Sequence, residues 1–172
     1  MFHRHSPLVI TTSRRSTRRT RSLVKELALL LGAVRVTRGK KSLPALYQEA
    51  AVMRARAVVI IANVKGNPGV LRIYHVKGGS LFATAAFRIE GVSLARESGK
   101  EIPRGAKRLS IESEKSPLAE EVAALLRSSL PPLERGRSLV LRVEEKEGRA
   151  EVSFHLGEVP VGPTLRLRPL KK

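Results

Sequence analysis

The stretch Leu8–Gly32 reads LVITTSRRSTRRTRSLVKELALLLG and contains three local patterns in succession. The β-branched residues of Leu8–Thr12 predict a short buried strand. After a basic turn, leucines recur at the spacing of one helix face and predict a helix over Thr20–Leu31, which Gly32 ends. These leucines are Leu23, Leu27, Leu30 and Leu31. A strand followed by a helix in so short a segment indicates an α/β fold.

The turn between this strand and this helix is strongly basic. Five arginines fall within eight positions, namely Arg14, Arg15, Arg18, Arg19 and Arg21. A helix N-terminus already carries about half a positive charge, so each added cation costs about 0.3–1 kcal/mol unless an anion is bound there. We therefore expect the turn to bind an anion through guanidinium and backbone N–H groups. Arginines that merely face solvent are the alternative.

Downstream of Gly32, strands and helices continue to alternate. The expected elements are a strand over Ala33–Thr37, a helix from Ser42 to about Arg54, a central strand over Ala57–Asn63, and a hairpin of Val70–Val76 with Leu81–Ile89. Ser42 is a favoured N-cap residue. The helix after it is expected to bury Leu43, Leu46, Ala50 and Met53.

The C-terminal part of the chain repeats this plan. After a connection at residues 91–105, we expect a strand over Arg108–Ile111, a helix from Ser116-Pro117, and strands near Ser138–Glu145, Ala150–Leu156 and Thr164–Leu167. The second helix shares the apolar spacing of the first, with Leu118, Val122, Leu125 and Leu126. It differs in having Glu120 and Glu121 near its N-terminus, where the first helix has arginines. The pattern predicts a diverged duplication within a single domain of residues 1–172, made of a basic half at 1–90 and a second half at 106–172.

Three basic turns follow the three expected strands of the N-terminal half. If those strands are parallel and joined by right-handed crossovers, the turns emerge together at the carboxyl edge of the sheet. The candidate binding residues in these turns are Arg14, Arg15, Arg18, Arg19, Arg21, Arg38, Lys40, Lys41, Lys65 and Asn67.

Composition indicates the kind of partner. The formal charge is +18 and the pI about 11.4, and the asymmetry lies at the N-terminus, where residues 1–90 hold 17 Lys or Arg against three Glu. Such an imbalance favours nucleic acid over an anionic membrane surface. The chain has no cysteine or aspartate and few amide residues, which is typical of a thermophile and excludes thiolate metal sites. No signal peptide or apolar run long enough to span a bilayer is present, so we expect a cytoplasmic protein.

Catalytic patterns are weak. Gly32–Ser42, GAVRVTRGKKS, resembles a phosphate-binding loop, but its spacing is wrong and a strand is expected inside it. The four histidines, His3, His5, His75 and His155, are isolated from one another, and the Glu pairs are adjacent, so that their side chains diverge. The few aromatic residues do not form a base-stacking pattern. We expect no cofactor, no metal and no small-molecule substrate.

Taken in order, three blocks resemble the Brix-domain family of ribosome-biogenesis proteins, in particular its short archaeal members. They are Ile10–Gly32, Arg38–Leu43 (RGKKSL) and Val58–Tyr74 (VVIIANVKGNPGVLRIY). The resemblance implies an α/β (α+β) fold of two related halves, each a sheet with packed helices, similar to the anticodon-binding domain of certain aminoacyl-tRNA synthetases. It implies a non-catalytic factor that binds rRNA or pre-rRNA, together with other assembly proteins. It also marks the basic residues from Arg14 to Lys65 as candidate RNA contacts.

Two other functions compete with RNA binding. An RNA-processing or RNA-modifying enzyme would need an acid, a base or a metal site that the sequence does not display. A membrane-surface module would carry its basic residues along an amphipathic helix, whereas here they fall in expected turns.

Overall fold

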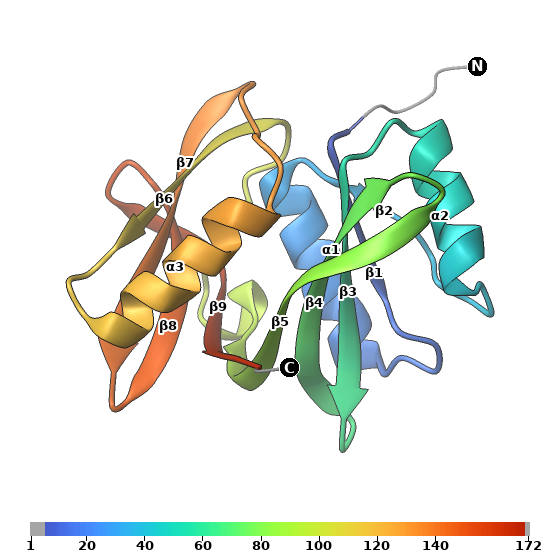
Figure 1. The fold of residues 1–172 in the computed structure, drawn as a ribbon. Helices are drawn as coiled ribbons and strands as arrows, with labels where there is room; N and C mark the ends of the chain where they lie inside the picture. The colour runs from blue at the N-terminus through green and yellow to red at the C-terminus, as the bar shows by residue number, and fades with distance from the viewer. Residues whose placement is uncertain (1–5, 171–172) are drawn as a thin grey trace.

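The computed structural model describes residues 6–170 of the chain, so His3 and His5 lie outside the described residues. The described part forms nine strands, three α-helices and one short 3-10 helix (Figure 1). Their order is β1 (Leu8–Thr12), α1 (Arg18–Leu31), β2 (Val34–Arg35), α2 (Leu43–Val52), β3 (Ala57–Val64), β4 (Asn67–Lys77), β5 (Ser80–Ser93), η1 (Ala95–Glu97), β6 (Lys107–Ser113), α3 (Pro117–Ser129), β7 (Arg137–Lys146), β8 (Arg149–Leu156) and β9 (Val159–Pro169). The expected mixed α/β class is confirmed.

All nine strands within residues 6–170 belong to one sheet, in the order β2-β1-β3-β4-β5-β9-β8-β7-β6. In the first half, β1 runs parallel to β2 and β3, and the β3–β4 and β4–β5 pairs are antiparallel. In the second half, β6 runs parallel to β7, and β7, β8 and β9 form an antiparallel meander. Strands β1, β3, β4 and β5 of the first half thus have the same relative directions as β6, β7, β8 and β9 of the second, and β2 and α2 have no counterpart among the described elements of the second half. Antiparallel pairing of β5 with β9 joins the halves into a continuous sheet.

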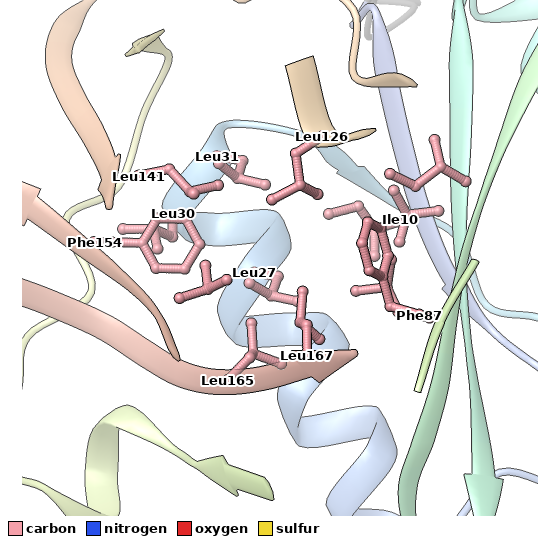
Figure 2. Close-up of a cluster of buried hydrophobic side chains, with 14 of the residues drawn as sticks. Ile10, Leu27, Leu30, Leu31, Phe87, Leu126, Leu141, Phe154, Leu165 and Leu167 are labelled. Carbon is pink, nitrogen blue, oxygen red and sulfur yellow. The ribbon is translucent and has the colours of Figure 1, made fainter. Parts of the chain in front are cut away.

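Helices α1 and α3 share one face of this sheet and fill the space between its two halves (Figure 1). α1 contacts β1 and β4 of the first half and also β6 and β9 of the second. Figure 2 shows Leu27 and Leu30 of α1 between side chains of both halves, among them Phe87 and Phe154. The main hydrophobic core is therefore common to the two halves.

The opposite face of the first half is covered by α2. Val9, Val58 and Ile60 point to this face and pack with Leu46 and Ala50 of α2. β3 is thus buried on both faces, as its apolar run predicts. The prediction that Leu43 is buried was wrong, since 40% of its surface is exposed. Leu43 is the first residue of α2, and the buried side chains of this helix are Leu46 and Ala50.

Several boundaries differ from the expected ones. α1 begins at Arg18, two residues earlier than expected, because the Thr17 side chain accepts the N–H of Thr20 and caps the helix. β2 is reduced to Val34–Arg35, and β5 continues through Ser93 into the expected connection. No helix of residues 6–170 is long and apolar enough to cross a membrane.

Candidate nucleic-acid interface

The three basic segments lie at the carboxyl ends of β1, β2 and β3, as the sequence predicts for parallel strands. Together they are called the basic edge, which comprises residues 13–21, 36–42 and 65–67. They gather along the lower right of the molecule in Figure 1. Not every candidate side chain is free within this edge, because some of them hold the loops in place.

Asn63 fixes the first segment to the end of β3. Its Nδ2 donates to the carbonyl oxygen of Arg15 at 2.8 Å, and its Oδ1 accepts from the backbone N–H and the hydroxyl of Thr17 at 3.2 and 3.3 Å. Arg15 adopts a left-handed conformation, with φ of 58°. Asn67 was the asparagine predicted from sequence, and Asn63 was missed. The available signal was a polar amide near the end of an otherwise apolar strand.

Among the exposed candidates of the first segment, Arg14, Arg15 and Arg18 form no hydrogen bond or ion pair with residues 6–170 through their charged groups. Arg21, also exposed, donates to the backbone carbonyl of Ser16 and so braces the loop. This part of the edge therefore presents guanidinium groups that are free to meet an anion.

Arg19 has a different role. Both of its terminal nitrogens donate to the Glu97 carboxylate, each at 3.0 Å, and Nη2 also donates to the carbonyl of Val92. This contact holds the pKa of Glu97 below its usual value, mainly through the Arg19 hydrogen bond. Glu97 thus supplies, from the connecting segment, a negative charge near the N-terminus of α1. Arg19 ties that segment to the helix.

In the second segment, Arg38 is buried, with 7% of its surface exposed. Its Nε donates to the carbonyl of Lys41 at 2.7 Å and its Nη1 to the carbonyl of Thr12 at 3.1 Å. Burial, and next the nearby charge of Arg14, lower the pKa of Arg38. Lys41 is paired with Glu49 at 3.0 Å, whereas Lys40 is exposed.

The first two segments enclose a cleft of about 390 Å³. Its lining includes Arg15, Arg21, Arg35 and Arg38, and no acidic residue among those described. Arg35 belongs to β2 and was not a candidate, since a residue inside an expected strand gives no sign that it faces a cleft.

The third segment faces a separate hollow of about 400 Å³. Lys65 and Asn67 line this hollow together with Arg19, Arg88 and Glu90. The basic edge therefore borders two concave surfaces, and Arg19 of α1 lines the second.

The second half presents its basic residues differently. On its uncovered sheet face, Arg142 pairs with Glu112, Arg166 with Glu151, and Arg168 with Glu90 of β5. Within the described part of the chain, no group of three or more histidine or acidic side chains is placed to hold a metal ion. Other exposed arginines of the second half, among them Arg108, Arg135 and Arg137, form no ion pair within residues 6–170, so the basic edge is distinguished by its arginine-lined cleft and not by unpaired charge alone.

Known proteins resemble this chain along most of its length. No protein-family profile matches it. A probable Brix domain-containing ribosomal biogenesis protein of Aeropyrum pernix is 37% identical over 167 residues, covering 92% of this chain and 93% of that protein. A relative with the same description from Methanopyrus kandleri is 37% identical over 92 residues, covering 53% of this chain and 48% of its own length.

Solved structures give the same result. The crystal structure of a probable ribosomal biogenesis protein from Aeropyrum pernix superposes with a TM-score of 0.87 and 34% identity, covering 96% of this chain and 97% of that one. The archaeal Imp4-like protein Mil superposes with a TM-score of 0.62 and 21% identity, covering 93% and 96% of the two chains. The second likeness shows a shared fold.

Proposed function

The chain belongs to the Brix domain-containing ribosomal biogenesis proteins, and we propose that within ribosome biogenesis it binds rRNA or pre-rRNA along its basic edge. The observation that carries the proposal is the cleft of about 390 Å³ at the basic edge, which is lined by four arginines and by no acidic residue among those described. On the basic edge, Arg14, Arg15, Arg18 and Lys40 are also exposed and have no acidic partner among residues 6–170. Unpaired cations gathered on one surface are the usual footprint of phosphate binding. Other assembly proteins would join the complex on the same RNA.

The proposed activity is binding without catalysis. The charged groups that line the 390 Å³ cleft are guanidinium groups, which stay protonated near neutral pH and do not exchange protons with a substrate. They are suited to hold phosphate oxygens by bidentate hydrogen bonds. An intact RNA recovered from the complex is the expected result, and RNA shortened or modified by the purified protein would contradict this part of the proposal.

The test is a salt titration of affinity for small-subunit rRNA fragments, an unrelated structured RNA and duplex DNA. The variant replaces five exposed cations of the basic edge and respects the positive φ of Arg15 and Lys65 by placing asparagine there. Its substitutions are Arg14→Ser, Arg15→Asn, Arg18→Ser, Lys40→Ser and Lys65→Asn. Each phosphate contact contributes about 0.7 to the slope of log affinity against log salt for single strands, so the variant should bind more weakly and with a shallower slope.

A control variant removes the same charge from the second half. It carries Arg108→Ser, Lys115→Ser, Arg135→Ser, Arg137→Ser and Arg149→Ser, all at exposed positions. We expect the control to lose little affinity and to keep most of the slope. Equal losses in the two variants would show that net charge, and not the basic edge, governs binding.

A further inference from the structure

The cleft between the first two basic segments contains a charge that the protein itself does not neutralise. Arg38 is 7% exposed, and within residues 6–170 it forms no ion pair. Its Nε and Nη1 donate to backbone carbonyls, which leaves Nη2 without a partner among the described residues. A buried charge without a counter-charge is costly, and the cost falls when an anion enters.

Three further guanidinium groups converge on the same space from different elements. Arg15 comes from the loop after β1, Arg21 from α1, and Arg35 from β2. The loop that carries Arg15 is fixed by hydrogen bonds, since Arg38 donates to the carbonyl of Thr12 and Asn63 donates to that of Arg15. Arg21 and Arg35 are held by their helix and strand. The anion site is therefore organised before any ligand binds, which reduces the entropic cost of binding.

The cleft is more than an anion site. Its volume of about 390 Å³ falls within the range of small-molecule pockets, about 300–1,000 Å³, and exceeds what a phosphate group alone needs. Val24 and Val36 contribute apolar lining beside the arginines, and Thr12 and Thr37 contribute polar groups. A planar guanidinium stacks on the face of a nucleobase without regard to sequence, and apolar side chains beside it can contact the edge of the same ring.

We propose that this cleft holds one nucleotide of the bound RNA, with its phosphate against the guanidinium groups of Arg35 and Arg38 and its base over Val24 and Val36. The inference rests on the proposed RNA binding and specifies it. RNA would be anchored at the cleft by one nucleotide taken out of its stack, while the exposed arginines of the edge hold the backbone on either side. Single-stranded or looped RNA is then favoured over a continuous duplex.

The experiment uses the full chain and three probes at one ionic strength, namely inorganic phosphate, ribose 5-phosphate and uridine 5′-monophosphate. Binding is followed by the NMR shifts of backbone amides at Ser13, Thr37 and Gly39, which line the cleft. We expect saturable shifts, with uridine 5′-monophosphate bound more tightly than ribose 5-phosphate. Arg35→Ser should raise the dissociation constant about tenfold or more, as expected for loss of a charge-assisted hydrogen bond.

Arg108→Ser is the matched control, because Arg108 is an exposed arginine of β6 that lies outside the basic edge and does not line the cleft. It should leave nucleotide binding nearly unchanged. Equal affinity for all three probes would reduce the cleft to a phosphate site and overturn the nucleotide proposal. If no probe shifts the NMR signals of the cleft amides while the chain still binds rRNA fragments in a salt-dependent way, this inference is overturned and the proposed function stands. Failure to bind rRNA fragments would reject the proposed function itself.

Discussion

At the residue scale, Asn63 connects the end of β3 to the arginine loop and to the cap of α1. Its amide donates to Arg15 and accepts from Thr17, so one half-buried side chain satisfies backbone groups on both sides of the loop. The left-handed conformation of Arg15 depends on this support, since a positive φ is strained in residues other than glycine or asparagine. In the proposed function, the arginines would therefore contact RNA from a loop that a neutral residue holds in place.

Replacing Asn63 with alanine should therefore damage the loop more than any single arginine change would. We expect Asn63→Ala to lower the free energy of unfolding by about 1–3 kcal/mol, because a Thr17 donor and an Arg15 acceptor lose their partner. Denaturant unfolding measures the change, and rRNA affinity should fall with it. Asn67→Ala is the control, at an exposed position at the start of β4. Similar losses in both variants would remove the special role assigned to Asn63.

Glu26 gives a pH-dependent prediction. Its side chain lies 6% exposed on α1 and accepts the N–H of Ala95 at 2.7 Å. Burial raises the pKa of Glu26 above its ordinary value, despite the lowering effects of that hydrogen bond and of Arg96. Because the pKa is higher in the folded chain than in the unfolded one, the contribution of Glu26 to stability is fully present below the unfolded pKa. It is lost as the pH rises through the folded pKa.

Glu26→Gln keeps an acceptor for the Ala95 N–H and removes the titration. The variant should thus be stabilised relative to the native chain at neutral pH, and the difference should shrink as the pH falls toward about 4, near the ordinary pKa of glutamate. Urea unfolding of both chains across this pH range measures the difference between their free energies of unfolding. The other titrating groups are the same in both chains, so their contributions cancel in this difference. A difference that is constant with pH would show that burial does not raise this pKa.

At the element scale, α1 ends at a glycine that also touches the second half. Gly32 has φ of 64° and caps α1, and a Cβ added there would lie 2.8 Å from both the Cα of Ala106 and the carbonyl oxygen of Gly105. Both neighbours are backbone atoms and cannot rotate away. The end of α1 is therefore fixed by a close approach of the segment that enters β6 as well as by its left-handed cap.

Gly32→Ala should lower the free energy of unfolding by more than the roughly 1–2 kcal/mol that left-handed strain alone costs. Gly39→Ala isolates that strain, because Gly39 also has a positive φ of 53° but its added Cβ meets nothing within 4 Å. Thermal or denaturant unfolding measures how much each variant loses in free energy of unfolding. The difference between the two losses is the cost of the clash at Gly32. Equal destabilisation would mean that the approach at Gly32 relaxes without cost.

Much of this element-scale structure could be predicted from sequence, because it follows from local rules. β1 has the expected residues, Ser42 and Ser116 cap their helices, and the parallel strands bring the basic segments to one edge. The burial of Arg38 and the pairing of Arg19 with Glu97 could not be predicted. Both depend on contacts between segments far apart in the chain, and a run of arginines does not show which member bonds to the protein and which to a ligand.

At the scale of the whole molecule, the sequence predicts two related halves, but it does not predict how they join. Strands β5 and β9 both alternate buried and exposed residues, and nothing local determines that they pair with each other. Their pairing makes one sheet, and α1 then lies between both halves (Figure 2). Ile10 and Phe87 of the first half share a core with Leu141 and Leu165 of the second.

A shared core and a continuous sheet predict that residues 1–172 unfold as one cooperative unit. Leu139 on β7 is fully buried, so Leu139→Ala should cost about 2–5 kcal/mol. In native-state hydrogen exchange, the most protected amides of β3, which lies in the other half, should lose the same free energy as those of β7. Val52→Ala, at a position 67% exposed on α2, should change neither set. If β3 keeps its protection while β7 loses it, the halves are separate folding units that merely share a sheet, and the basic edge would then be stable without the second half.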